Sequence, residues 1–154
     1  MARRKIPLHA LPALLAAVTA CSTTPPAATL STESDVTRAI TSGLDQRVTL
    51  SPAELVAGEN VAIHSTITNR GTQPVALQSR ICGLDLGGDL TLTWPPGIGV
   101  CGGHSMGGTI GPDESRESSE LRRVASEPGT YTLRVRHALQ PEQWVEVRVV
   151  VRGR

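Results

Sequence analysis

Ser105 lies in the segment CGGHSMGG (residues 101–108), which contains the pattern Gly-x-Ser-x-Gly. This pattern can present a nucleophilic serine on a sharp turn between a strand and a helix, where the serine attacks an ester or amide. Such chemistry also needs an acid and a histidine further along the chain. The candidates are Asp113 or a later glutamate, together with His137, the only histidine after Ser105.

The sequence around Ser105 does not favour that structure. Residues 95–103 (PPGIGVCGG) place few apolar residues among prolines and glycines, so they do not indicate a buried strand. After the serine, Gly107, Gly108 and Pro112 oppose a helix. The remaining residues are also too few to complete a sheet wrapped by helices. We therefore predict that the protein is not an enzyme.

Cys82 and Cys101 are further side chains that could do chemistry. In an exported protein two such thiols meet an oxidising environment, where they form a disulfide. In the chain-entropy estimate, a loop of this size contributes about 3 kcal/mol to stability. The alternative is a soft-metal site in which His104 joins the two cysteines. No fourth ligand is evident, so we predict a disulfide and neither a metal nor another cofactor.

Other polar side chains have simpler interpretations. His64 falls on the polar face of an alternating segment, where a solvated histidine is expected. Four arginines near the C-terminus could line one outer face, with Glu146 among them; they are Arg134, Arg136, Arg148 and Arg152. We interpret this face as solvated and charged, and a modest site for anionic groups is the alternative.

The N-terminus predicts export. Arg3, Arg4 and Lys5 precede an apolar stretch that is too short to span a bilayer, as in a signal peptide over residues 1–20. The run Val-Thr-Ala-Cys at residues 18–21 then resembles the lipobox of bacterial lipoproteins, which implies that Cys21 is lipidated and becomes the new N-terminus. An ordinary secretory signal is the alternative. Ser22, in place of an aspartate, implies delivery to the outer membrane, facing the periplasm or the cell surface.

Residues 21–46 are expected to form the lipidated end and a flexible tether. They are rich in Ser, Thr, Ala and Pro, and they carry too few large apolar residues to offset the entropy of ordering. A transient helical turn over residues 34–40 is the only local structure that the pattern suggests. We therefore place the folded domain at residues 47–152.

Within that domain the apolar residues recur every second position, as in half-buried strands. The pattern is strongest over residues 131–135 and 145–151, and it is also present over 60–68, 75–78 and 90–94. Residues 47–50 add a first strand, and residues 118–124 add a weaker one. About seven such strands in roughly 100 residues predict an all-β, antiparallel, immunoglobulin-like sandwich. Tyr131 follows a Pro-Gly turn and is a candidate for the tyrosine corner of such folds. An open sheet or small barrel is the alternative.

Composition sets outer limits on function. The 154 residues amount to one domain, and the formal net charge of +1 leaves no broad basic field for nucleic acid. Phenylalanine is absent and the aromatic residues are Trp94, Trp144 and Tyr131. The core must therefore consist mainly of aliphatic side chains.

Several turn motifs carry a further resemblance. Residues 58–61, 68–71, 111–115 and 128–131 (GENV, TNRG, GPDES and PGTY) resemble the BsuPI-like proteinase inhibitor family and related bacterial immunoglobulin-like domains. The resemblance implies this fold over most of residues 47–151. Protease inhibition is an alternative function, with no inhibitory residue transferable.

Taken together, these patterns predict a lipid-anchored cell-envelope protein whose domain is a non-catalytic binding or structural module. Its expected partners are the membrane, through Cys21, and a protein of the envelope. The glycine-rich stretch over residues 83–111 is the expected contact loop, because long loops on a rigid sandwich commonly carry recognition. A metal-binding envelope protein is a lesser alternative.

Overall fold

The computed structural model describes residues 32–41, 43–80, 83–98, 106–137 and 143–154. All regular structure in these residues is extended, and none of it is helical. The all-β prediction is therefore confirmed. None of the described residues belongs to a helix long and apolar enough to cross a membrane.

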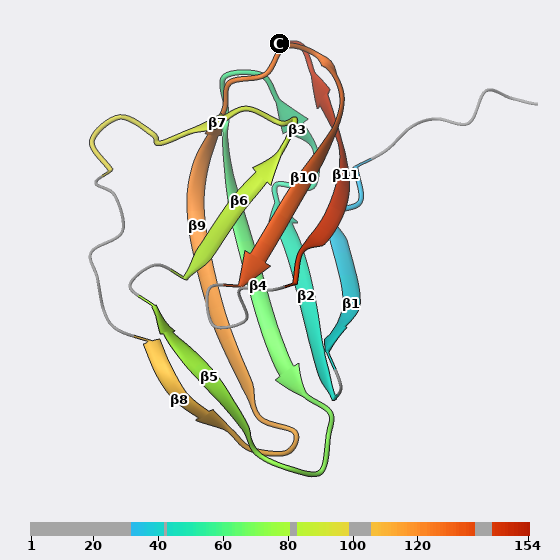
Figure 1. Cartoon of the computed structure of the whole chain (residues 1–154). Helices are drawn as coiled ribbons and strands as arrows, with labels where there is room; N and C mark the ends of the chain where they lie inside the picture. The colour runs from blue at the N-terminus through green and yellow to red at the C-terminus, as the bar shows by residue number, and fades with distance from the viewer. Residues whose placement is uncertain (1–31, 42, 81–82, 99–105, 138–142) are drawn as a thin grey trace, which may run out of the picture.

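Within these described ranges, eleven strands form three hydrogen-bonded groups (Figure 1). Sheet A has the order β1 (Asp35–Thr41), β2 (Leu44–Ser51), β4 (Asn60–Asn69), β9 (Ser115–Val124) and β7 (Leu92–Thr93). Sheet B has the order β3 (Leu55–Val56), β11 (Val145–Arg152), β10 (Gly129–His137) and β6 (Leu84–Gly88). A separate pair consists of β5 (Val75–Arg80) and β8 (Met106–Ile110). All pairings are antiparallel except that of β3 with β11.

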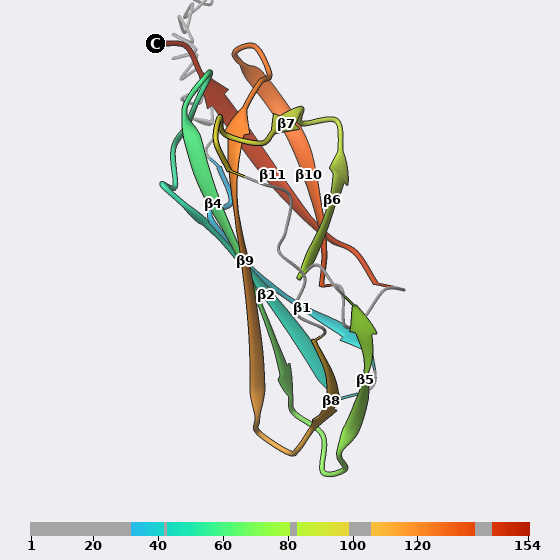
Figure 2. The same cartoon turned by 90° about the vertical axis from the view of Figure 1, so that its left-hand side faces the viewer.

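Sheets A and B face each other, and the β5–β8 pair lies below sheet B, alongside the lower half of sheet A (Figures 1 and 2). One hydrophobic cluster joins all three groups, since it contains Ile63 and Ile67 of β4, Leu133 of β10 and Ile110 of β8. Alternation explains this core directly, because every second residue of a strand points to the same face. In β11 the inward residues are Val145, Val147, Val149 and Val151.

The folded region begins before the predicted boundary at residue 47. Thr32 and Glu33 lie along the outer edge of β11, where Glu33 N–H donates to the Arg148 carbonyl at 2.8 Å. The chain then crosses to sheet A and pairs along β2 as β1. Residues 35–41 and 44–46, which were expected to belong to the tether, therefore lie in strands β1 and β2. Val36 and Ile40 are buried in the hydrophobic core. Their packing holds β1 in the domain although most of its other residues are polar.

Other strands also differ from the prediction. β9 is ten residues long, although the sequence indicated only a weak strand over 118–124. The strand expected over residues 90–94 is reduced to the two residues of β7. The expected contact loop over residues 83–111 instead contains β6, β7 and β8. Short strands such as these carry too few alternating residues to stand out in a sequence.

Candidate functional site

A cleft of about 380 Å³ opens between the two sheets, where β6 forms the free edge of sheet B and faces β7 and β9 of sheet A. Its walls are mainly apolar and include four leucines: Leu84, Leu86, Leu90 and Leu92. Trp94, Glu120 and Arg122 also line it. The volume is at the lower end of the range for small-ligand sites in proteins.

The end of β6 shapes this cleft. Gly88 has φ of +99°, and a Cβ atom there would lie 2.0 Å from the Thr132 carbonyl oxygen, so no other residue fits without a shift. Asp89 then donates its N–H to that carbonyl and accepts the Thr132 N–H on its carboxylate. These contacts turn the chain from sheet B toward sheet A, where Leu92 and Thr93 pair with β9.

Glu120 and Arg122 place charge on the inner face of β9. Both side chains are largely covered, with exposed fractions of 7% for Glu120 and 15% for Arg122. Arg122 Nε donates to Glu120 Oε2 at 2.9 Å, and Arg122 Nη2 donates to the same oxygen. Since β9 alternates between faces, these two residues occupy inward positions between the buried residues Ser118 and Val124.

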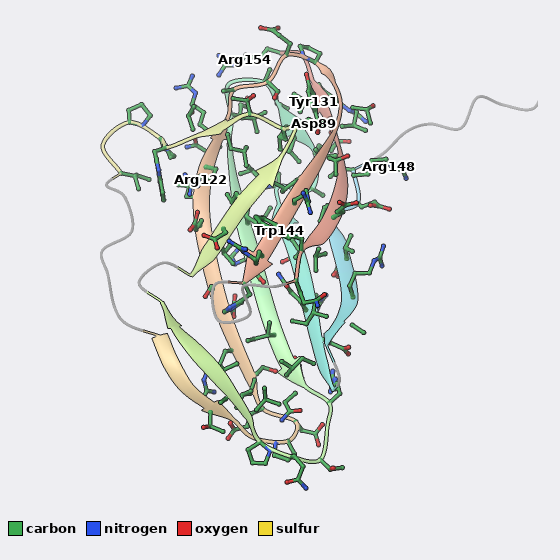
Figure 3. All side chains as sticks on the ribbon, viewed as in Figure 1. Asp89, Arg122, Tyr131, Trp144, Arg148 and Arg154 are labelled. Carbon is green, nitrogen blue, oxygen red and sulfur yellow. The ribbon has the colours of Figure 1, made fainter. Side chains whose placement is uncertain are left out.

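Trp94 covers this ion pair. The guanidinium carbon of Arg122 lies 3.4 Å from the centroid of the Trp94 ring, a stacked cation–π contact. The next residues are Pro95 and Pro96, which cannot continue a hydrogen-bonded ladder. The positions of Arg122 and Asp89 around β6 can be followed in Figure 3.

The cleft offers binding groups but no nucleophile. Its described lining holds no serine, cysteine, threonine or histidine. It has two carboxylates, and each is held by an arginine, Glu120 by Arg122 and Asp85 by Arg136 at 2.7 Å. This arrangement suits recognition of a ligand by shape, apolar contact and a few hydrogen bonds.

Most of the cysteine and serine chemistry considered from the sequence lies outside the described residues. This applies to Cys21, Cys82, Cys101, His104 and Ser105. Within the part of the chain that is described, no group of three His, Cys, Asp or Glu side chains could hold a metal ion. Immediately after Ser105 the chain continues as strand β8, which begins at Met106.

Neither of the two described histidines belongs to the cleft lining. His64 is on the outer face of sheet A, and its Nδ1 lies 3.5 Å from Glu117 Oε1. His137 is fully buried at the end of β10. Burial lowers the pKa of His137 from its ordinary value of 6.5 to about 4, so the ring is neutral at pH 7.

The arginines of the last two strands are matched by carboxylates. The pairs are Arg134–Glu146 at 3.4 Å, Arg136–Asp85 at 2.7 Å, Arg148–Glu33 at 4.0 Å and Arg152–Glu54 at 3.2 Å. Trp144 lies over Gly87 on the same outer face, with the guanidinium groups of Arg134 and Arg136 at 5.1 Å and 4.5 Å from its ring centroid. The positive charge of this face is therefore locally balanced.

A second hollow lies on the outer face of sheet A and is polar throughout. It is lined by side chains of β1, β2, β4 and β9 with Arg70, and it contains Thr37, Thr66 and Thr68. Arg47 spans part of it and binds both carboxylate oxygens of Asp35. This hollow is about as open as the cleft beside β6, but all of its lining residues are polar. The leucines and Trp94 of the cleft make it the better candidate for a binding site.

The cleft beside β6 was not among the sites that the sequence predicted. A usable signal was present, since Ser118, Glu120 and Arg122 share one face with Val124 and so place polar residues where a strand should be apolar. A tryptophan directly before two prolines was a second signal. What the sequence could not indicate is that β6 and β7 would bring leucines to these residues.

No protein-family model and no curated protein sequence matches the chain. Among solved structures, the chain is similar to the Pseudomonas fluorescens alkylpurine DNA glycosylase AlkC bound to DNA containing an abasic site analog. That similarity has 13% sequence identity and a TM-score of 0.45, over 72% of this chain and 31% of the glycosylase chain. The chain thus spans about a third of the length of that enzyme.

Proposed function

We propose that this protein is an exported, lipid-anchored component of the bacterial cell envelope whose β-sandwich is a non-catalytic binding module. In this proposal Cys21 carries the lipid, and the cleft beside β6 is the ligand site. The observation that carries the proposal is the Glu120–Arg122 pair beneath Trp94, set among leucines at the open edge of the sandwich.

The stability of the domain does not by itself account for a charged pair in the interior of the sandwich. Removing two charges from water costs free energy that their attraction only partly offsets, and apolar replacements are often as stable. The inward positions of β11 all hold valine, and those of β10 include Leu133 and Val135 before the strand ends at the buried His137. The retained charges in β9 therefore favour a role in recognition.

The finer description of the fold that we propose is immunoglobulin-like. The order β2-β4-β9-β7 corresponds to strands A-B-E-D, and β11-β10-β6 corresponds to G-F-C, with β1 added at the edge of sheet A. Tyr131, near the start of β10, donates its hydroxyl to the Glu127 carbonyl at 2.8 Å, as in a tyrosine corner. Neither β4 nor β10 contains a cysteine, so the inter-sheet disulfide of antibody domains has no counterpart.

The absence of catalysis is supported by the neighbourhood of Ser105. A serine on a strand-to-helix turn needs a helix directly behind it, whereas residues 106–110 form β8. His137, the required base, is buried at the end of β10. These observations favour a binding module over a serine hydrolase.

A photo-crosslinking amino acid in place of Trp94 tests this proposal in intact cells. The benzophenone analogue of phenylalanine keeps an aromatic group at the cleft, and we expect it to form a discrete adduct with an envelope component. The matched control places the same analogue at Leu121, an exposed residue on the opposite face of β9. Loss of the adduct in a Glu120→Leu/Arg122→Leu background would connect it to the ion pair. No adduct from position 94, or the same adducts from both positions, would contradict the proposal.

A further inference from the structure

The geometry points to an extended polypeptide segment as the ligand of this cleft, added as a strand to the free edge of β6 with one apolar side chain inserted between the sheets. This inference rests on the proposed function, because it uses the same cleft. It goes further by naming the chemical class of the ligand and the backbone groups that would hold it.

The first observation is the direction of the backbone groups in β6. Asp89 N–H donates to the Thr132 carbonyl, and the register pairs Gly87 with Arg134 and Asp85 with Arg136. Bonded residues alternate in an antiparallel ladder, so Leu86 and Gly88 direct their N–H and C=O groups away from β10. Among the described strands only β10 pairs with β6, so β6 is the edge strand of sheet B in this part of the chain.

At the opposite edge of sheet B, the outward backbone groups of β11 have hydrogen-bond partners, unlike those of β6 among the described residues. Thr32 and Glu33 bond to the backbone of Arg148 and Val150 along the outer side of β11. Further along, β3 pairs with Val151 and Arg152. Exposed strand edges are usually protected by proline, by charged side chains such as lysine, by β-bulges, by short length or by covering segments. The sequence of β6, Leu-Asp-Leu-Gly-Gly, has neither proline nor lysine, and its one charged residue, Asp85, is paired with Arg136. None of the other described strands pairs with its outward backbone groups.

The cleft lies where the side chains of an added strand would point. Successive side chains of a strand alternate between its two faces, so a segment beside β6 would direct every second side chain between the sheets. There Leu84, Leu86 and Leu92 provide an apolar lining. Adding a strand to a sheet edge in this way combines backbone hydrogen bonds for affinity with pockets for alternate side chains.

The ion pair offers one hydrogen-bond donor and one acceptor that together can bind an amide group. Both bonds between Arg122 and Glu120 use Oε2, so Arg122 Nη1 and Glu120 Oε1 have no hydrogen-bond partner among the described residues. An amide carbonyl can accept from the first, and an amide N–H can donate to the second. One charge of each sign also fits a neutral amide better than an isolated anion or cation. The preferred segment therefore carries an apolar residue next to an amide, from the main chain or from Asn or Gln.

Titration of the purified, ¹⁵N-labelled mature chain with blocked heptapeptides tests the inference by NMR. The peptides share alternating threonine, asparagine and valine, and they differ at a central leucine, phenylalanine or aspartate. We expect the leucine or phenylalanine peptide to shift the amide signals of Leu86 and Gly88 and the indole signal of Trp94. The aspartate peptide should bind at least about tenfold more weakly, because a charge would enter an apolar cleft.

N-methylation of the peptide separates strand pairing from simple apolar binding. Methylation of every second amide along the pairing edge should weaken binding at least about tenfold, whereas methylation along the other edge should change it less than about twofold. On the protein side, Glu120→Leu/Arg122→Leu should weaken binding, with exposed Leu121→Thr as the matched control.

Three outcomes would overturn the inference. Equal losses from both methylation patterns would exclude strand addition. Concentration-dependent shifts of Leu86 and Gly88 without peptide would identify a second copy of the chain as the occupant. No shift with any peptide, combined with a crosslinked adduct from position 94, would leave the binding module in place and exclude a peptide ligand.

Discussion

His137 is the residue at which burial changes chemistry most clearly. It lies at the inward end of β10 and is fully covered, and desolvation lowers its pKa to about 4. A buried imidazole of this kind stays neutral through the physiological range, and protonation becomes a cost to folding. The residue that sequence reasoning considered as a catalytic base is thus placed in the interior of the domain.

This burial predicts a loss of stability in mild acid. In the unfolded chain His137 takes up a proton near pH 6.5, whereas in the folded chain it does so only near pH 4. Between those values the unfolded state binds more protons, so the free energy of unfolding falls as the pH falls from 6.5 to 4, by roughly 3 kcal/mol in total. Above about pH 7 the group has no effect.

Urea unfolding of the purified protein at pH 7.0 and 5.0 measures this loss. His137→Gln, which is neutral at both pH values, should show a smaller difference between them. His64→Gln is the matched control, because that histidine lies on the outer face of sheet A. An unchanged pH dependence in His137→Gln would show that another group is responsible.

Among the elements, β9 and β1 show most clearly how tertiary contacts decide what a segment becomes. β9 pairs along its length with β4 and carries exposed charge on one face and a covered ion pair on the other. β1 is an edge strand whose sequence, DVTRAIT, contains only two large apolar residues. Both residues are buried, and the pairing with β2 supplies the backbone hydrogen bonds.

If β1 is part of the folded domain, truncating Ile40 will destabilise it. Ile40→Ala removes a buried side chain that belongs to the core, and we expect a loss of about 2–5 kcal/mol in the free energy of unfolding. Ala39→Ser, at the adjacent exposed position, should change stability by less than about 0.5 kcal/mol. Urea unfolding of the two variants and the parent provides the comparison. Equal stabilities would place residues 35–41 back in the tether.

At the scale of the whole molecule, the two sides of sheet B have different roles in the proposal. The chain enters along the sealed edge at β11, and the cleft lies at the open edge by β6. Residues 22–31 separate the proposed lipid on Cys21 from Thr32, and a stretch of that length spans at most about 35 Å. The module would therefore be held close to the membrane.

Replacement of the proposed lipidation site tests this arrangement. In Cys21→Ser no thiol is available for acylation, so we expect the protein to move from the membrane pellet to the soluble fraction. Stable anchoring needs at least two lipid chains at one site. Because Cys21→Ser removes the acylated residue, nearly all of the protein should leave the membrane fraction. The released protein should keep the far-ultraviolet circular dichroism of a β-protein. If Cys21→Ser stays in the pellet, another feature holds the chain there.

Part of the fold was predictable because it depends on local pattern. Alternation in β4, β10 and β11 indicated half-buried strands, and all three are strands in the structure. The weaker elements, β1, β3, β6 and β8, are short or poor in apolar residues. The partners of β3, β6 and β8 are also distant in the chain. The candidate site was missed for the same reason, since its walls come from segments that only the sheet arrangement brings together.

The amino-acid sequence by itself determined the class of the fold and the aliphatic character of the core. It also contains the patterns that predict export and lipidation at Cys21. These properties follow from the order of apolar and polar residues along short segments. Only the tertiary structure decided that Glu120 and Arg122 lie inside, that Trp94 covers Arg122 and that β6 is the edge strand of sheet B among the described residues. The physical reason is that burial and pairing are properties of neighbours in space, which a single strand cannot specify.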